Sequence, residues 1–162
     1  MARPSRLQPG MKQLTSQPLS AAEKMLSRRL YSAAELRCKL LDKGYSHGEI
    51  ELALENLLQR GCLNDALLCD MVYRKYHTAC RHSHRYIIAK LRARGFDDQT
   101  IQTTLKEYAD LDESQAALNV LRKRYARPEA LESAKLVRYL AGKGFSYEII
   151  TQAIRLLNEP IM

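Results

Sequence analysis

A seven-residue phrase that occurs three times constrains the fold of this chain more than any other feature. It spans Lys39–Tyr45, Lys90–Phe96 and Tyr139–Phe145, and each copy ends in a basic residue, a glycine and an aromatic residue. The glycines stand at positions 44, 95 and 144, which are 51 and 49 residues apart. A nearly constant spacing of this length predicts tandem repeats of one small structural unit.

Apolar residues at fixed distances from each glycine predict two helices in every repeat. Leucine or isoleucine occurs eight and four residues before the glycine, and again six and ten residues after it. Each spacing of four places both side chains on one face of a helix. The residues before the glycines are Leu36, Leu40, Ile87, Leu91, Leu136 and Leu140, and those after them are Ile50, Leu54, Ile101, Leu105, Ile150 and Ile154.

The residues around each glycine predict where the helices end and begin. A glycine after Lys or Arg is typical of a helix C-terminus, because glycine adopts the left-handed conformation cheaply and the cation faces the negative end of the helix. Serine or aspartate then stands at the expected N-cap of the next helix. The sequence predicts capping boxes at Ser20/Glu23, Ser32/Glu35 and Ser46/Glu49, and further N-caps at Asp97 and Ser146.

A third helix is expected before each pair, over about residues 21–31, 65–78 and 113–125. We therefore predict an all-α fold of three tandem three-helix repeats that form an elongated, curved solenoid. Pro4, Pro9 and Pro18 indicate a flexible N-terminal tail. The predicted divisions are the tail at residues 1–19 and repeats at 20–62, 63–110 and 111–162.

Composition indicates a folded protein with an anionic partner. The formal net charge is +8, and 46% of the residues are hydrophobic. Neither a membrane-spanning stretch nor a secretory signal is evident, which predicts a cytoplasmic protein. The four cysteines, Cys38, Cys62, Cys69 and Cys80, form no CxxC pair and are expected to be reduced.

Two basic clusters are the candidate surface for a protein partner or DNA. One lies between residues 74 and 94, where no acidic residue occurs, and the other lies in the third repeat. Such runs also occur as ordinary solvated helix faces, and this alternative stays open. The candidate residues, chosen on charge alone, are Arg74, Lys75, Arg81, Arg85, Lys90, Arg92, Arg94, Arg122, Lys123 and Arg124.

Two other segments are candidates for metal or catalytic chemistry. His77, Cys80, His82 and His84 are potential zinc ligands, but their spacing does not match a zinc finger, and a polar loop is the preferred interpretation. Gly142-Lys143-Gly144 lacks the earlier glycine of a phosphate-binding loop and is interpreted as a helix end. We predict no catalytic residue, no metal site and no cofactor.

Three segments resemble the RecX family of bacterial recombination regulators: Gly61–Asp65 leading into a helix, Lys90–Phe96, and the stretch from Arg124–Arg127 through Lys135–Phe145. Ser32–Leu36 looks like the family's first-repeat signature, and the resemblance covers about residues 20–157. The chain departs from the family at the turn of the middle repeat, where Cys80 and its neighbours replace a lysine-glycine pair. Arg124-Tyr125-Ala126 also lacks a glycine that the family has.

The resemblance implies a regulatory protein, not an enzyme, that binds the RecA filament on DNA and inhibits its ATPase and strand-exchange activities. It implies roles in homologous recombination, DNA repair and the SOS response. A repeat array with its own core is expected to be a monomer. The alternatives are a stand-alone basic nucleic-acid-binding protein and a zinc-dependent protein. With two Phe, no Trp and no evident aromatic platform, the sequence does not predict strong base stacking.

Overall fold

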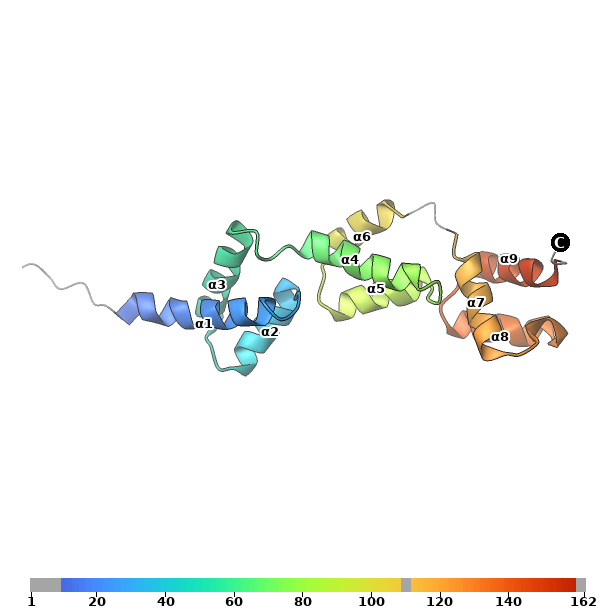
Figure 1. Ribbon diagram of the computed structural model, residues 1–162, viewed down its shortest axis with the longest axis horizontal. Coiled ribbons are helices and arrows are strands. Elements are labelled where there is room, and N and C mark those ends of the chain that lie inside the picture. Colours follow the sequence, from blue (N-terminus) through green and yellow to red (C-terminus); the bar gives the residue numbers. More distant parts are fainter. Residues whose placement is uncertain (1–9, 109–111, 160–162) are drawn as a thin grey trace, which may run out of the picture. The chain divides into compact units, whose positions relative to one another are not determined.

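The computed structural model describes residues 10–108 and 112–159 and is helical throughout these ranges, with no strand among them (Figure 1). The chain divides into two compact units, residues 1–68 and 69–162, which are described separately. The prediction of an all-α fold is confirmed. The α-helices are α1 Gly10–Leu26, α2 Ala33–Asp42, α3 His47–Gln59, α4 Asp65–Thr78, α5 His84–Ala93, α6 Asp98–Lys106, α7 Ser114–Arg124, α8 Ser133–Gly142 and α9 Tyr147–Asn158.

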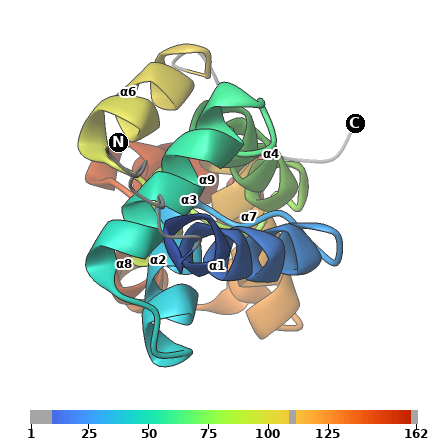
Figure 2. The same ribbon diagram turned by 90° about the vertical axis from the view of Figure 1, so that its left-hand side faces the viewer.

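The first unit buries its core between α1, α2 and α3. Helix α1 packs against both α3 and α2, and Figure 2 views it nearly end-on. Leu36 and Leu40 on α2 and Ile50 on α3 are fully buried, as the repeat pattern predicts. The core of this unit consists of Ala22, Leu36, Leu40, Ile50, Leu54, Leu57 and Leu63.

Two of the predicted capping boxes start helices in this unit. Ser32 caps α2 together with Glu35, and Ser46 caps α3 together with Glu49, each with both reciprocal hydrogen bonds present. The backbone N–H of Ala33 also donates to the Asp65 carboxylate at 3.0 Å. The first residue of α4 thereby binds the start of α2, where backbone N–H groups lack helical partners.

The N-terminal helix is longer than the sequence indicates. Helix α1 begins at Gly10 and continues through Pro18, so residues 10–19 belong to a helix instead of the predicted tail. Pro18 has no N–H for the helical hydrogen bond at its position, and its side chain is buried. Ser20 lies inside α1, so the capping box predicted there is wrong, and the Glu23 carboxylate pairs with Arg60 at 2.5 Å instead. Residues 1–9 of the predicted tail lie outside the described residues.

The second unit contains the rest of α4 and the helices α5–α9. Helix α9 packs against both α7 and α8, and α5 packs against α6 (Figure 1). Most of the predicted apolar stripe residues are again buried, with Ile87, Leu91 and Ile101 at 0% exposure and Ile150 at 1%, whereas Leu105 and Ile154 are only half-buried. The cluster formed by α7, α8 and α9 consists of Ala116, Ala117, Val120, Leu121, Leu136, Leu140, Phe145, Ile150 and Ala153.

The three phrase glycines have the backbone conformation that the sequence predicts. Gly44, Gly95 and Gly144 have φ values of +86°, +77° and +87°, in the left-handed region that favours glycine. Asp97 and Ser146 then cap the following helices, α6 and α9, as predicted. The same helix–glycine–helix connection therefore occurs three times.

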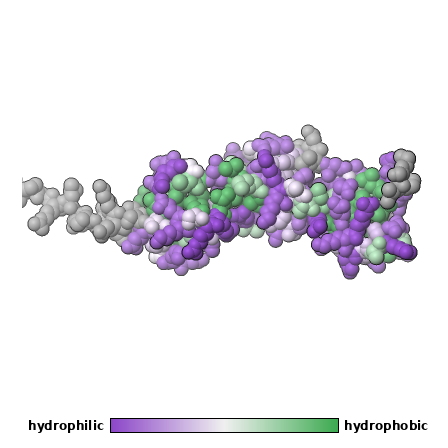
Figure 3. Space-filling model, viewed as in Figure 1, coloured by the Kyte–Doolittle hydropathy of each residue, from purple (hydrophilic) through white to green (hydrophobic). Residues whose placement is uncertain are grey.

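The surface is mostly hydrophilic on the face drawn in Figure 3, with apolar side chains showing between polar ones. None of the described helices combines the length and the apolar character that a membrane crossing needs. The large apolar side chains that are exposed are Leu30, Leu52, Leu58, Leu67, Met71, Tyr86 and Tyr147.

Candidate functional site

Ser83 joins the start of α5 to the end of α8. Its buried hydroxyl accepts a hydrogen bond from the backbone N–H of Tyr86 at 3.2 Å, which caps α5. The same hydroxyl donates to the backbone carbonyl of Lys143 at 2.8 Å. A Cβ atom added at Gly144 would lie 2.9 Å from the Ser83 Oγ, so the close approach requires glycine there. This contact brings the α4–α5 turn against the third helix triplet.

Two further side chains hold the same turn. The Asn119 amide on α7 donates to the Cys80 carbonyl at 3.2 Å, and the Glu113 carboxylate accepts from the His84 backbone N–H at 3.0 Å. Cys80 has φ +44°, the only positive φ among the described non-glycine residues. Cysteine here adopts the left-handed turn conformation at the place where the sequence departs from the expected glycine.

A pocket of about 540 Å³ opens where this turn meets α7 and α8. Four cationic side chains line it: Arg81 from the turn, Lys123 and Arg124 from the end of α7, and Lys143 from the end of α8. No carboxylate lies in the lining, so the described pocket has uncompensated positive charge. The other lining residues are Ala79, His82, Tyr86, Val120 and Tyr139.

Aromatic rings form a second feature of this pocket. The rings of His82 and Tyr86 are stacked, with centroids 4.4 Å apart and an interplanar angle of 11°. Tyr76 packs edge-on against both, at 5.4 and 6.0 Å. On the α8 side, the Tyr139 ring lies 5.5 Å from the Lys143 ammonium. Cations and flat rings are therefore interleaved around one opening.

The positive charges act on His82. Burial lowers the pKa of this imidazole, and the charges of Lys90, Arg81 and Lys123 lower it further. His82 is consequently neutral at pH 7. It contributes a flat uncharged ring to the pocket while its neighbours supply the charge.

The predicted candidate residues divide into three groups. Arg81, Lys123 and Arg124 line the pocket. Lys90 does not line it, but its ammonium lies 5.3 Å from the ring centre of Tyr86, which does. Lys75, Arg85 and Arg122 are exposed but do not line it. Their predicted role as contact residues stays a prediction.

The remaining candidates have partners within the chain. Arg74 contacts the carboxylate of Asp70 at 3.0 Å and also donates to the Tyr108 hydroxyl at 2.8 Å. Arg92 pairs with Asp98 at 2.9 Å, and the Arg94 guanidinium lies 5.8 Å from the ring centre of Phe96. These three side chains are less available to an external anion than those in the pocket.

Four aromatic or cationic residues that line the pocket were not predicted as contacts. Tyr86, Tyr139 and Lys143 were not chosen as contacts, and His82 was considered only as a metal ligand. The available signal was the occurrence of Tyr or His between basic residues in both clusters. The stacked rings also form an aromatic platform that the sequence analysis did not identify.

The four potential zinc ligands do not converge. His82 stacks on Tyr86, whereas His77 stacks on Tyr73 at 5.8 Å and the Nδ1 of His84 lies 3.3 Å from Glu113. Within residues 10–108 and 112–159, no group of three or more His, Cys, Asp or Glu side chains is arranged to hold a metal ion. The histidines instead pack as aromatic rings.

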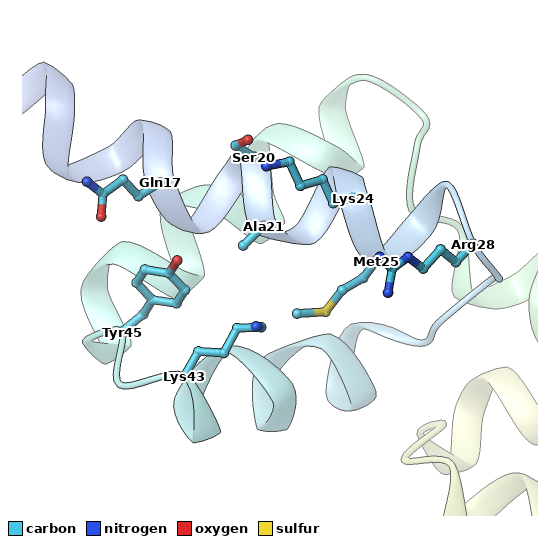
Figure 4. A pocket seen from close by; sticks show the side chains of 8 residues that line it. All are labelled: Gln17, Ser20, Ala21, Lys24, Met25, Arg28, Lys43 and Tyr45. Atoms are coloured by element: carbon cyan, nitrogen blue, oxygen red, sulfur yellow. The ribbon is translucent and has the colours of Figure 1, made fainter.

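A second basic pocket lies in the first unit, with a volume of about 710 Å³. Figure 4 shows Lys43 and Met25 pointing toward one another between α1 and the α2–α3 turn. Lys24 on α1 and Arg28 in the turn that follows it add positive charge. It contains no predicted candidate and no stacked ring pair, so the pocket in the second unit is the stronger candidate site. The other residues lining it are Gln17, Ser20, Ala21 and Tyr45.

Comparisons with known proteins give one consistent match. The family patterns described as "RecX, first three-helix domain" and "RecX, third three-helix domain" match residues 12–57 and 112–154. A relative from Mannheimia succiniciproducens, described as "Regulatory protein RecX", is 34% identical over 140 residues, which cover 83% of this chain and 90% of the relative. A protein of the same description from Thermus thermophilus is 35% identical over 144 residues, covering 89% and 94%.

Solved structures support the same fold. A crystal structure of RecX from Lactobacillus salivarius superposes with a TM-score of 0.78 at 23% identity, covering 91% of this chain and 99% of that one. A second, described as "Crystal structure of regulatory protein RecX", gives a TM-score of 0.77 at 16% identity and covers 94% of this chain and 80% of that one. At these identities the likeness is one of fold.

Proposed function

The chain belongs to the RecX family of regulatory proteins, and we propose that it binds the RecA recombinase filament on DNA and inhibits its ATP hydrolysis and strand exchange. The observation that carries this proposal is the convergence of Arg81, Lys123 and Lys143 on one pocket. These residues are far apart in sequence, and the turn contacts described above bring them together.

The proposed mechanism is electrostatic and steric. The four cations in the pocket attract acidic groups of the recombinase or the phosphates of its DNA, and this attraction speeds encounter and fixes orientation. A bound chain then obstructs the movements that accompany ATP hydrolysis. No step of this mechanism requires a catalytic residue, a metal or a cofactor in this chain.

The proposed activity also implies where the protein acts and in which processes. A protein that acts on the recombinase filament works in the bacterial cytoplasm, in homologous recombination, DNA repair and the SOS response. We expect it to act as a monomer, because each unit has its own buried core.

The test is the rate of single-strand-DNA-dependent ATP hydrolysis by the cognate recombinase during titration with this protein. We expect inhibition at substoichiometric ratios. In the variant R81E/K123E the concentration for half-inhibition should rise at least about tenfold, because two attractive charges become repulsive. The matched control is K39E/K106E, which makes the same charge change at residues outside both pockets.

Two outcomes would contradict the proposal. Equal inhibition by R81E/K123E and wild type, with the helical content of both unchanged, would show that the pocket is not the contact surface. Unaltered hydrolysis together with tight binding to bare DNA would support the alternative, a stand-alone nucleic-acid-binding protein, whose affinity should fall steeply with salt.

A further inference from the structure

The ring pair in the pocket has no role in a purely electrostatic contact. An acidic protein surface needs only the cations, whereas His82 and Tyr86 place a pair of flat rings, stacked on each other, beside those cations. Tyr86 is 36% exposed and is one of the large apolar side chains that solvent reaches. Flat rings interleaved with cations are the combination by which proteins bind unpaired bases and their phosphates.

The dimensions and the charge of the pocket agree with a nucleotide-sized ligand. A volume of about 540 Å³ falls within the usual range for small-ligand sites, so there is room for a base and its sugar. The neutral imidazole of His82 stacks without placing a cation among the rings. Arg81 and Lys123 lie close enough to His82 to act on it electrostatically, so phosphate-binding charge and stacking surface belong to one site.

The ligand is better explained as a strand than as a free nucleotide. Positive charge continues beyond the lining, because the ammonium of exposed Lys90 lies 5.3 Å from the ring centre of Tyr86. A mononucleotide has no second phosphate group to reach it, whereas a flanking phosphate of a strand does. Duplex DNA is a poorer fit, because its bases are stacked on each other and unavailable to protein rings.

We propose that this pocket is a binding site for single-stranded nucleic acid, in which one unstacked base packs on the His82–Tyr86 pair and the flanking phosphates contact Arg81, Lys123 and Lys143. The proposal goes beyond recombinase regulation, because the site binds the strand without a recombinase. The test therefore uses this chain without a recombinase. If the chain does not bind single strands in this test, the proposed regulation of the recombinase filament is unaffected.

The first experiment is fluorescence anisotropy of a labelled thymidine oligonucleotide titrated with the full chain. Y86L removes the ring but keeps an apolar side chain, and we expect it to weaken binding by about 5- to 150-fold, the range for loss of one stacking contact. Y86F keeps the ring and should bind within about twofold of wild type. Y147L is the matched control, because Tyr147 is 74% exposed on α9 and outside the pocket.

The second experiment measures the salt dependence of the same binding. K123Q should reduce the slope of log affinity against log salt by about 0.7, the value for one lost phosphate contact on a single strand. K106Q, at a lysine outside the pocket, should leave the slope unchanged. If Lys123 had only a structural role, K123Q would not reduce the salt slope by the amount that one phosphate contact contributes.

Competition identifies the ligand class. Unlabelled single strand should displace the probe, and duplex of equal length, thymidine monophosphate and a poly-glutamate peptide should do so far more weakly. The proposal is overturned if Y86L binds like wild type, if the peptide competes as well as the strand, or if the monophosphate does. The peptide result would assign the pocket to an acidic protein segment, and the monophosphate result to a free nucleotide.

Discussion

The hydroxyl of Ser83 donates a 2.8 Å hydrogen bond to the backbone carbonyl of Lys143, 60 residues further along the chain. Ser83 is fully buried and also caps α5. One side chain thereby starts a helix and fixes the end of α8 beside it. The positions of Arg81 and His82 in the pocket depend on this contact, because both belong to the turn that Ser83 ends.

Ser83→Ala should lower the free energy of unfolding by about 1–3 kcal/mol, because it removes the cap and leaves the Lys143 carbonyl without this donor. Ser146→Ala is the matched control, since Ser146 is an exposed N-cap of α9 that makes only the capping bond. We expect it to cost about 0.5–1 kcal/mol. Urea denaturation followed by circular dichroism measures both, and equal losses would show that the Lys143 bond contributes nothing.

Gly144→Ala should lower the free energy of unfolding of the second unit by more than the cost of placing alanine in the left-handed backbone conformation. The left-handed φ of +87° costs about 1–2 kcal/mol for alanine, and the new Cβ would also lie 2.9 Å from the Ser83 Oγ. Gly142→Ala, two residues earlier and with open space around it, should be neutral or stabilising by up to about 1 kcal/mol. A Gly144→Ala protein as stable as wild type would contradict the close packing.

Most of the fold follows from local sequence because its determinants are local. The helix ends at Gly44, Gly95 and Gly144 and the boxes at Ser32 and Ser46 depend on residues within one turn of the chain. The failures have tertiary causes. The capping box predicted at Ser20/Glu23 fails because α1 begins ten residues earlier, at Gly10, and continues through Pro18, and the Glu23 carboxylate pairs with Arg60, 37 residues away.

The candidate site was only partly predictable for the same reason. Charge identified Arg81 and Lys123, but their meeting depends on the long-range contact of Ser83 with Lys143. Some weaker candidates had a local signal, because Asp70 stands four residues before Arg74 on α4, the spacing of a helical ion pair. This spacing alone indicates that Arg74 pairs within its own helix and is a weaker candidate for contact with a partner.

Tyr73 lies at 0% exposure with its ring stacked on Tyr108 at 4.4 Å. Burial raises the pKa of its phenol to about 12, and its hydroxyl has no hydrogen-bond partner among the described residues. Tyr73→Phe should therefore maintain stability or raise it by up to about 2 kcal/mol, whereas Tyr73→Ala should cost about 3–5 kcal/mol. Thermal denaturation compares them, and a clear loss in the Phe variant would reveal a hydrogen bond to that hydroxyl.

The histidines near the α4–α5 turn make stability depend on pH. Burial lowers the pKa of His77 and of His82 from the ordinary value of 6.5. The neighbouring His84 lowers the pKa of His77 further while Glu113 opposes this, and the charges of Lys90, Arg81 and Lys123 lower the pKa of His82 further. When the folded pKa is the lower one, the unfolded state binds protons first. Both histidines are neutral in both states well above pH 6.5, so their contribution is complete there and is lost as pH falls through the folded values.

The variant H77Q/H82Q should accordingly show a smaller loss of stability between about pH 7.5 and about pH 5 than the wild type. Glutamine does not titrate in the folded or the unfolded state, so the contribution of the two histidines to the pH dependence of stability disappears. This holds whatever the substitutions do to the stability at the upper pH. Urea denaturation at a series of pH values gives the slope directly. H47Q, at an exposed position on α3, serves as the control and should keep the wild-type slope. Identical slopes for H77Q/H82Q and wild type would mean that the two imidazoles are as readily protonated in the folded chain as in the unfolded one.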